Sequence, residues 1–572
     1  MNSTNETEYL AEYLAEHRRR VQASWPAGLT REPWYPHGEV PLTEYLRAWA
    51  RVQGEKPSVI FYGRAVTYAE LDDLSDRFAA LLSAHGVGRG DRVAVFLPNC
   101  PQFHVAFFGI LKLGAIHCPV SPLSKPFELA YQLGDTGAET IVTLDTLMPV
   151  VREVMSGTKL RTVFATSFAE MLPAEPTIPL PAMLKEARIS CPDAIDLLPA
   201  LAAVTEAAPS VPVGLDDVAA LNYTGGTTGM PKGCIHTQRD MIYTAATNLA
   251  VSSPVAPDTV SLSFFPEFWI AGENGCLIWP VFGGTTLVLL ARWDPVAFLT
   301  AIERYRVTNT GLPVDGAVEL MDHPRFGEFD LSSLRQVKVV SFVKKLNLAY
   351  RRRWQELTGS ILAESAWGMT ETHTSDTFTS GMQGDDFDLH SQPVFVGLPV
   401  PGTEFKICDF DTGALLPFGQ EGEICCRSPS VLKGYWGKPD ATADALRDGW
   451  LHSGDIGIID EGGYLHFLGR RKEMLKVKGM SVFPAEIEAV LGQHPDIAGS
   501  GVIGRSDPDR GQVPVAFIRL NAGSATASPD AIRAWLAERI AVYKVPEIRV
   551  LDELPMTATG KVKKGELAAF LD

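Results

Sequence analysis

Short apolar runs alternate with longer segments of helical periodicity along most of the chain. Thr67 and Glu70 have the spacing of a capping box, and apolar residues follow them at helical spacing: Leu71, Leu74, Phe78, Leu81 and Leu82. RVAVFLP (92–98) and ETIVTLD (139–145) each predict a strand, and PQFHVAFFGILKLG (101–114) predicts a helix between them. This alternation predicts helices packed on largely parallel strands, which is an α/β fold.

Other stretches depart from this rhythm. Between about 155 and 213 the sequence is rich in Pro and Ala, which predicts a connecting segment on the surface, with no function assigned. After about Pro399, TEFKICD (403–409) and GEICCRSP (422–429) predict a compact antiparallel unit of short strands. The first 22 residues predict an exposed helix of mixed charge.

The length of the chain requires more than one domain. At 572 residues it exceeds the roughly 250–300 residues at which a single core stops growing. The last hundred or so residues again combine helical and extended patterns, and the charged segment Gly469–Glu473 precedes them as a linker or hinge would. We therefore expect an N-terminal domain over 1–469 and a C-terminal domain over 470–572.

Composition narrows the class of protein. The net charge of −17 and the pI of about 5.3 argue against broad binding to nucleic acid, although one basic loop suffices for a nucleotide. The N-terminus lacks the apolar core of a signal peptide, and no run approaches the ~18 apolar residues of a transmembrane segment. Eight scattered cysteines without a CxxC predict reduced structural thiols, with no metal-thiolate site or disulfide framework. We expect a soluble cytoplasmic enzyme.

One loop is built to contact phosphate. Tyr223–Gly233 contains four glycines, three threonines and one lysine between two apolar runs. Glycines let backbone N–H groups turn towards an anion, threonines add hydroxyl donors, and Lys232 supplies a positive charge. A nucleotide-binding P-loop is excluded, because Pro231 precedes the lysine and Gly233 follows it. The alternative is a flexible turn without a ligand.

Four later segments carry further candidate residues. ESAWGMTET (364–372) offers Trp367 as a flat face for a base and Glu371 as a hard oxygen for Mg²⁺. Each of these residue types is more often core or surface when it stands alone. The other candidates are Asp455 for ribose hydroxyls and Lys561 in a turn close to the C-terminus. Arg470, Lys476 and Lys478 lie in or just after the join, the charged segment 469–473 between the two expected domains.

In their order along the chain, these segments resemble the adenylate-forming superfamily of acyl-CoA synthetases, peptide-synthetase adenylation domains and luciferases. VTYAELDDLSDRFAALL (66–82) and VGLPVPGTEFKICD (396–409) extend the resemblance to nearly the whole chain from about Pro41. It implies a large N-terminal domain of α/β subdomains plus a short-stranded β unit, and a small mobile C-terminal α+β domain. It also implies ATP, Mg²⁺ and coenzyme A as co-substrates or cofactors and a small-molecule carboxylic acid as substrate. It implies no nucleic acid partner and is compatible with a homodimer.

The resemblance further implies a role for each matching residue. Lys561, Glu371 and Thr228 would be catalytic, Thr228 and Glu371 would hold the metal, and Lys472 would be the hinge. Asp455 and Arg470 would bind ribose, and Trp367 would stack on adenine in a slot usually filled by Tyr. The nucleotide and CoA would contact Thr224, Gly225, Gly226, Thr227, Thr228, Gly229, Lys232, Trp367, Gly368, Met369, Thr370, Asp455, Arg470, Lys476, Lys478 and Lys561.

The sequence departs from the family pattern at two places that should affect which carboxylic acid is bound. The family's Gly-rich turn is replaced by Ser341–Lys345, and Trp269 stands in a slot usually filled by His. We therefore expect an acyl pocket formed by Trp269, Phe342, Val343, Lys344 and Trp367. Lys344 or Lys345 would contact a second polar group on the acid, unless both lysines point to solvent. Trp269 would gate the pocket or simply pack in the core.

The reaction implied by the resemblance is ATP-dependent ligation of a carboxylic acid, fatty or otherwise small and organic, to CoA. An acyl-AMP intermediate forms first, and a thiol then displaces AMP. An acyl-AMP ligase that loads a carrier protein is the nearest alternative. A luciferase-like oxygenase and a non-catalytic relative remain open.

Overall fold

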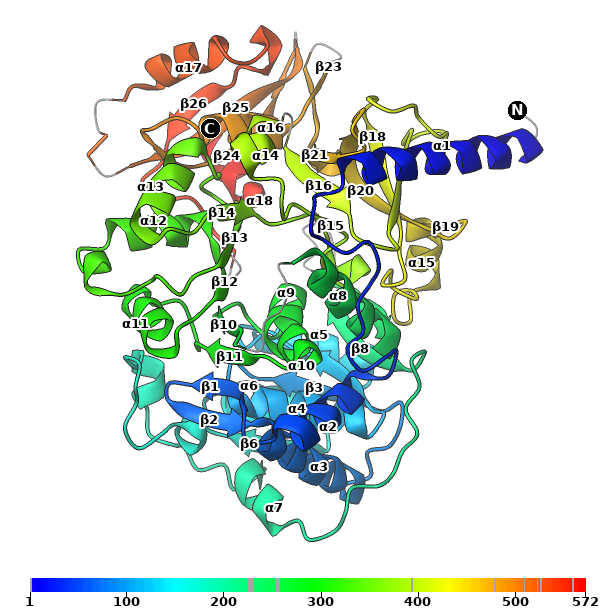
Figure 1. The fold of residues 1–572 in the computed structure, drawn as a ribbon, viewed down its shortest axis with the longest axis vertical. Helices are drawn as coiled ribbons and strands as arrows, with labels where there is room; N and C mark the ends of the chain where they lie inside the picture. Colours follow the sequence, from blue (N-terminus) through cyan, green and yellow to red (C-terminus); the bar gives the residue numbers. More distant parts are fainter. Residues whose placement is uncertain are drawn as a thin grey trace.

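The computed structural model describes residues 3–224, 230–252, 258–391, 394–477, 480–508, 510–521, 523–524, 527–557 and 560–571. A large body runs from blue to yellow in Figure 1, and a smaller unit, orange to red, lies against one end of it. The mixed α/β organisation with a large N-terminal and a small C-terminal part is confirmed.

Two seven-stranded sheets form the centre of the large body. In both, neighbouring strands run parallel except for one hairpin at an edge, so the predicted parallel sheets are confirmed. The first sheet has the order β7 (Ile195–Asp196), β6 (Thr162–Thr166), β5 (Thr140–Leu144), β3 (Arg92–Phe96), β4 (Ile116–Pro119), β8 (Val218–Tyr223) and β9 (Gly233–Thr237). The second has the order β14 (Leu362–Glu364), β13 (Gln336–Val340), β12 (Asn309–Pro313), β10 (Val260–Ser263), β11 (Thr286–Leu289), β1 (Pro57–Phe61) and β2 (Arg64–Thr67).

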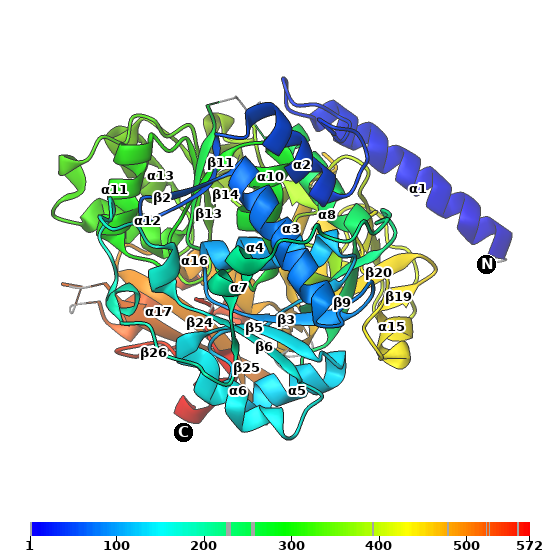
Figure 2. The ribbon, with the colours of Figure 1, turned by 90° about the horizontal axis from the view of Figure 1, so that it is seen from below.

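Helices cover both faces of the first sheet (Figure 2). α3 (Tyr68–Ala84) and α4 (Pro101–Lys112) pack on one face within a core that reaches the second sheet, while α5 (Pro126–Thr136) and α6 (Met148–Met155) cover the other face. The remaining helices of these two layers are α2 (Leu42–Gln53), α7 (Leu197–Ala203), α8 (Gln238–Val251), α9 (Ile270–Gly272), α10 (Trp279–Gly283), α11 (Pro295–Tyr305), α12 (Val314–Asp322) and α13 (Leu348–Thr358).

The predicted start of α3 is confirmed in one of its two capping interactions. Thr67 Oγ1 accepts a hydrogen bond from the Glu70 N–H at 3.1 Å, which satisfies one donor of the first turn. The Glu70 carboxylate instead pairs with Arg64, so the reciprocal half of the capping box is replaced by an ion pair.

Two expectations are wrong in part. The segment between 155 and 213 is not only a surface connection, because its TVFAT run forms β6 inside the first sheet. The strand was not predicted because it is short and is followed by a proline-rich segment. The N-terminal helix α1 (Ser3–Ser24) is not exposed on all sides: Tyr13 is buried and stacks on Phe418 with the ring centroids 4.3 Å apart.

A third sheet follows as the expected antiparallel unit, and α1 lies along it (Figure 1). Its strands are β15 (Thr377–Phe378), β16 (Phe395–Pro399), β21 (Leu465–Arg470), β20 (Trp450–Ile459), β18 (Gly422–Arg427) and β17 (Glu404–Cys408), with β19 (Leu446–Arg447) paired to β20 and with helices α14 (Phe387–His390) and α15 (Pro439–Ala445). This unit extends to Arg470, beyond the expected end near Tyr464.

The C-terminal part has its own sheet and core. Its strands are β23 (Met480–Val482), β22 (Leu475–Val477), β25 (Gly511–Leu520) and β24 (Ile497–Asp507), with β26 (Glu547–Val550) beside β25, and its helices are α16 (Pro484–Leu491), α17 (Pro529–Ala537) and α18 (Lys564–Leu567). The chain passes from the third sheet to this one between Arg470 and Leu475. The division at 469/470 stays a prediction. Within the described residues, no helix combines the length and apolar character that crossing a bilayer requires.

Candidate active site

A cavity of about 2630 Å³ brings most of the sequence candidates together. Its walls come from the β8–β9 hairpin, α8, strands β10, β12 and β13, the segment after β14, the join near Arg470 and the C-terminal part. Residues far apart in the sequence therefore face one space between the large body and the C-terminal part.

The Gly/Thr loop connects the antiparallel strands β8 and β9. At its base, the Thr224 N–H donates to the Lys232 carbonyl at 3.0 Å, and both residues line the cavity. Lys232 Nζ lies 4.2 Å from the centroid of the Tyr435 ring, a cation–π contact that holds the ammonium group at the cavity wall. Gly225, Gly226, Thr227, Thr228 and Gly229 lie outside the described residues.

Glu371 stands beside this lysine. It belongs to a short 3₁₀ turn, Thr370–Thr372, and the Tyr435 hydroxyl donates to its Oε1 at 2.9 Å. Tyr435 thus contacts Lys232 through its ring and Glu371 through its hydroxyl. The sequence analysis missed this tyrosine, although the GYWGKP segment that contains it could have drawn attention to it.

The turn before Glu371 depends on Gly368. A Cβ atom at this position would lie 1.2 Å from the Thr374 carbonyl oxygen, so only glycine lets the two chain segments approach this closely. Gly368, Met369 and Thr370 all line the cavity, and their contact with a nucleotide stays a prediction.

Asp455 and Arg470 meet across neighbouring antiparallel strands. They are register partners on β20 and β21, and Arg470 Nε lies 3.4 Å from Asp455 Oδ1. That oxygen is buried and accepts no hydrogen bond from the described residues, and Asp455 lies behind the cavity wall that Gly454 and Arg470 form. Burial raises the pKa of Asp455 to about 6, against the lowering effect of Arg470.

Trp367 does not take the expected place. Its indole N–H donates to Asp455 Oδ2 at 2.9 Å, and its ring packs edge-on against Phe405 in the core of the third sheet. Its neighbours Ala366 and Gly368 line the cavity, whereas Trp367 is 6% exposed and is not part of that wall. This geometry supports a role in holding Asp455 and contradicts a stacking face in the pocket.

Lys561 reaches into the cavity from the C-terminal part. Its Nζ lies 5.8 Å from the Trp269 ring and 5.5 Å from the Phe342 ring. Burial lowers its pKa, and Arg470 acts in the same direction. Lys561 therefore lies close to the two aromatic rings and within electrostatic reach of the Asp455–Arg470 pair.

Besides Trp367, two more of the expected pocket residues lie elsewhere. Val343 packs with Val515 and Phe517 of the C-terminal part, and Lys344 Nζ donates to Asn521 Oδ1 at 3.1 Å. Lys345 is turned back, with its Nζ 2.9 Å from the Ser341 carbonyl oxygen. The apolar and charged residues after Phe342 therefore form an interface between the two parts, which sequence alone did not separate from a pocket.

Of the basic residues near the join, Lys472 lines the cavity and burial lowers its pKa. Lys476 is exposed and is not part of the wall, while its backbone N–H donates to Gln512 Oε1 at 2.8 Å. Lys478 lies outside the described residues.

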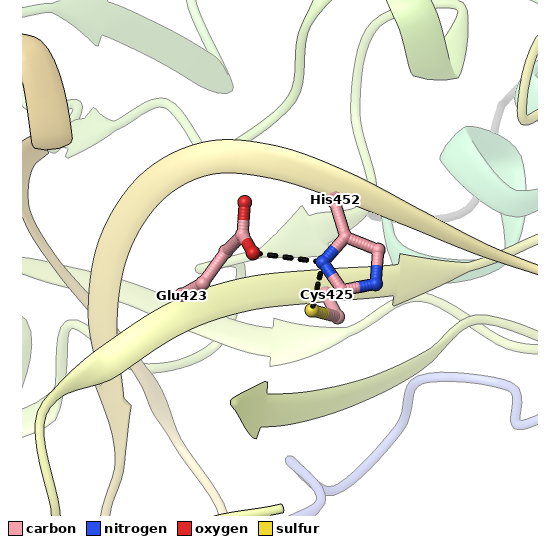
Figure 3. Close-up of side chains that lie close together, drawn as sticks. All are labelled: Glu423, Cys425 and His452. Atoms are coloured by element: carbon pink, nitrogen blue, oxygen red, sulfur yellow. Dashed lines mark hydrogen bonds and ion pairs between the residues drawn. The ribbon is translucent and has the colours of Figure 1, made fainter. Parts of the chain in front are cut away.

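A second feature that the sequence did not reveal supports Asp455 from behind. Glu423, Cys425 and His452 converge on adjacent strands (Figure 3). His452 Nδ1 lies 2.7 Å from one oxygen of Glu423 and 3.5 Å from Cys425 Sγ, and the other Glu423 oxygen accepts the Gly454 N–H at 3.0 Å. The cluster thereby fixes the bend that presents Asp455. Spacing in sequence gave no signal for it.

Comparison with known proteins gives a consistent match. The family model described as AMP-binding enzyme matches residues 46–436, and that of the AMP-binding enzyme C-terminal domain matches residues 486–561. The chain is 34% identical over 538 residues to a long-chain-fatty-acid–CoA ligase of Yersinia pestis, covering 92% of this chain and 93% of that protein. It is 33% identical over 539 residues to 4-coumarate–CoA ligase 3 of Oryza sativa subsp. japonica, covering 93% and 92%.

The fold agrees with these matches. The crystal structure of the anthranilate CoA ligase AuaEII in complex with anthranoyl-AMP superposes with a TM-score of 0.80 at 27% identity, covering 94% of this chain and 98% of that one. The protein therefore belongs to the AMP-binding enzyme family, in the adenylate-forming superfamily, and is of the acyl-CoA synthetase type.

Proposed function

We propose that the protein is an ATP-dependent carboxylic acid–CoA ligase that works through an acyl-AMP intermediate. The observation that carries the proposal is the position of Lys561, whose ammonium group lies beside Trp269 and Phe342 in a cavity that is also lined by Arg470, the ion-pair partner of Asp455. A cation is thereby held where the carboxylate of an acid and the α-phosphate of a nucleotide would meet.

In the first half-reaction, a carboxylate oxygen of the acid attacks the α-phosphorus of ATP, and pyrophosphate leaves. Negative charge builds on the phosphate oxygens in the transition state, and Lys561 is the group placed to stabilise it. In the second, the CoA thiolate attacks the carbonyl carbon of acyl-AMP and AMP leaves.

The residues present fit a nucleotide. The buried, unbonded Asp455 Oδ1 beside Arg470 is an acceptor for a ribose hydroxyl, and Lys232 stands at the base of the Gly/Thr loop with its charge towards the cavity wall. Glu371 offers the hard oxygen that Mg²⁺ prefers, held by Tyr435. When bound, Mg²⁺ would neutralise phosphate charge next to Glu371.

The C-terminal part must move between the half-reactions. Lys561 now occupies the region beside Trp269 and Phe342, so a thiol reaches the same carbonyl only after this part has turned away. The join contains Arg471–Glu473 as a single 3₁₀ turn, and Lys472 within it is our candidate for the turning residue.

The acid is fatty or another small organic acid. The relatives are a long-chain-fatty-acid–CoA ligase and a 4-coumarate–CoA ligase, and their acids differ in shape.

The test is to incubate the full chain with ATP, Mg²⁺, CoA and a panel of aliphatic and aromatic acids, and to identify thioesters by mass. We expect one thioester, one AMP and one pyrophosphate per turnover with at least one acid. Pyrophosphate without thioester would favour the carrier-loading alternative. The absence of pyrophosphate with every acid would contradict the proposal.

A further inference from the structure

Lys338 projects into the cavity from β13, the strand next to the edge strand β14 of the second sheet. On β13, Gln336, Lys338 and Val340 line the cavity, whereas the intervening Val337 and Val339 are fully buried in the core, as the alternation of a strand requires. Its register partners are Gly311 on β12 and Ala363 on β14. These small neighbours leave room around the lysine on the cavity face.

The ammonium group of Lys338 has no protein partner within the described residues, neither a hydrogen bond nor an ion pair. Burial lowers the pKa of Lys338 to about 8, so the charged form still predominates at neutral pH. An unpaired charge at such a position costs folding free energy. A ligand that brings the opposite charge would offset this cost.

Polar residues lie beside Lys338 on this face, and among the residues that the structure describes no carboxylate pairs with its ammonium group. Ser261, Asn309 and Gln336 are register partners on three neighbouring strands of the same face, and Asn309 Nδ2 donates to Gln336 Oε1 at 3.1 Å. Glu364 on the adjacent β14 is engaged elsewhere, because the Ser341 N–H donates to its Oε1 at 2.9 Å. This wall suits a polar, anionic group better than the end of an alkyl chain.

A line of aromatic rings connects this wall to Lys561. Phe265 lies over Gly311, 3.3 Å from where a Cβ atom would stand, and its ring centroid is 6.3 Å from that of Trp269. Trp269 in turn lies 5.8 Å from Lys561 Nζ. An acid activated at Lys561 can extend past these rings towards Lys338.

We propose that the preferred substrate carries a second anionic group, a carboxylate at the far end of the acid, and that Lys338 binds it. This rests on the proposed function, since the first carboxylate is placed by the activating site. The remote group adds binding energy and selects diacids, while the chemistry at the first carboxylate stays the same.

The test compares straight-chain dicarboxylic acids with the monocarboxylic and the ω-hydroxy acid of each length. Pyrophosphate release is measured with ATP and Mg²⁺, and binding of each acid to the full chain is measured by calorimetry without ATP. We expect the unmodified protein to prefer one diacid. Lys338→Met should lower the diacid-to-monoacid ratio of kcat/KM roughly 10- to 100-fold, the range for a hydrogen bond to a charged group.

Lys338→Arg keeps the charge and should restore part of the preference. Lys185→Met is the matched control, because it removes an exposed lysine that does not line the cavity. An unchanged ratio in Lys338→Met, or equal use of diacid and monoacid by the unmodified protein, would overturn the inference and leave the ligase function standing. Diacid binding that depends on Lys338 without any pyrophosphate would support the inference and contradict the ligase function. Neither binding nor turnover of any diacid would overturn the inference.

Discussion

At the scale of single residues, the candidate site combines side chains from separate motifs: Arg470, Glu371 and Lys561 line one cavity, and Arg470 pairs with the buried Asp455. Each of these four residues lies in a short motif whose turn residues fix the backbone, so the sequence could point to them. Trp367 was assigned to the cavity and lies behind it. Whether an aromatic ring points into a pocket or into the adjacent core depends on long-range packing that no local motif contains.

Asp455 should make nucleotide use depend on pH. Its pKa is raised to about 6 by burial, so the carboxylate form is present above pH 6 and is lost as the pH falls through that value. A protonated Asp455 accepts ribose hydroxyls poorly. We expect the KM for ATP to rise as the pH falls below about 6, measured by pyrophosphate release between pH 5 and 8.

Asp455→Asn provides the control for this effect. The variant should show a raised KM for ATP at every pH and no inflection near pH 6. If the inflection persisted in the variant, another group would be responsible.

Lys232 and Lys561 should differ in their importance. Lys232 contacts the Tyr435 ring at the base of the loop, away from the aromatic pair that contacts Lys561. Lys232→Ala should therefore raise the KM for ATP roughly 10-fold, the effect of losing one charge-assisted contact, and should retain turnover. A completely inactive but folded Lys232→Ala would show that this division of roles is wrong.

At the scale of elements, periodicity predicted α3, α4 and the strands around them, because an apolar stripe or run states which face is buried. β6 was overlooked because five residues between proline-rich segments carry little periodic signal. The position of Ser341–Lys345 could not be predicted from the sequence either, since its apolar and basic residues pack against the C-terminal part, on residues after 490.

The turn after β14 should tolerate no side chain at position 368. A Cβ atom there would lie 1.2 Å from the Thr374 carbonyl oxygen, and backbone cannot move aside without disrupting the turn that holds Glu371. Gly368→Ala should lower Tm by several degrees and reduce pyrophosphate release, as measured by thermal unfolding and by activity.

Gly134→Ala is the matched control. Gly134 lies within α5 with nothing within 4 Å of an added Cβ atom, so alanine should stabilise the helix by about 0.5–1 kcal/mol. Equal unfolding temperatures for the two variants would contradict the close approach at Gly368.

At the scale of the whole molecule, the order of motifs along the chain predicted the family and the two-part organisation. The contact between the N-terminal and C-terminal parts could not be predicted from the sequence, because it depends on how the C-terminal part is oriented. In the structure, the C-terminal part is oriented so that Lys561 lies in the cavity. Lys564 Nζ also forms an ion pair with Glu473 of the join, at 2.7 Å.

Lys472→Pro should separate the two half-reactions. Proline fixes φ near −65° and removes the N–H, so the join would turn less freely. We expect thioester formation from acyl-AMP and CoA to slow far more than acyl-AMP formation, measured separately by single-turnover assays. Equal losses in both would show that the turning point lies elsewhere.

The central claim is that Lys561 stabilises the charge that develops while acyl-AMP forms. The most direct measurement compares Lys561→Ala with the unmodified protein in two assays, pyrophosphate release from acid and ATP, and thioester formation from synthetic acyl-AMP and CoA. We expect the first rate to fall by a factor of at least about 10²–10³ and the second rate to be largely retained. Equal losses in both assays, or an unchanged first rate, would contradict it.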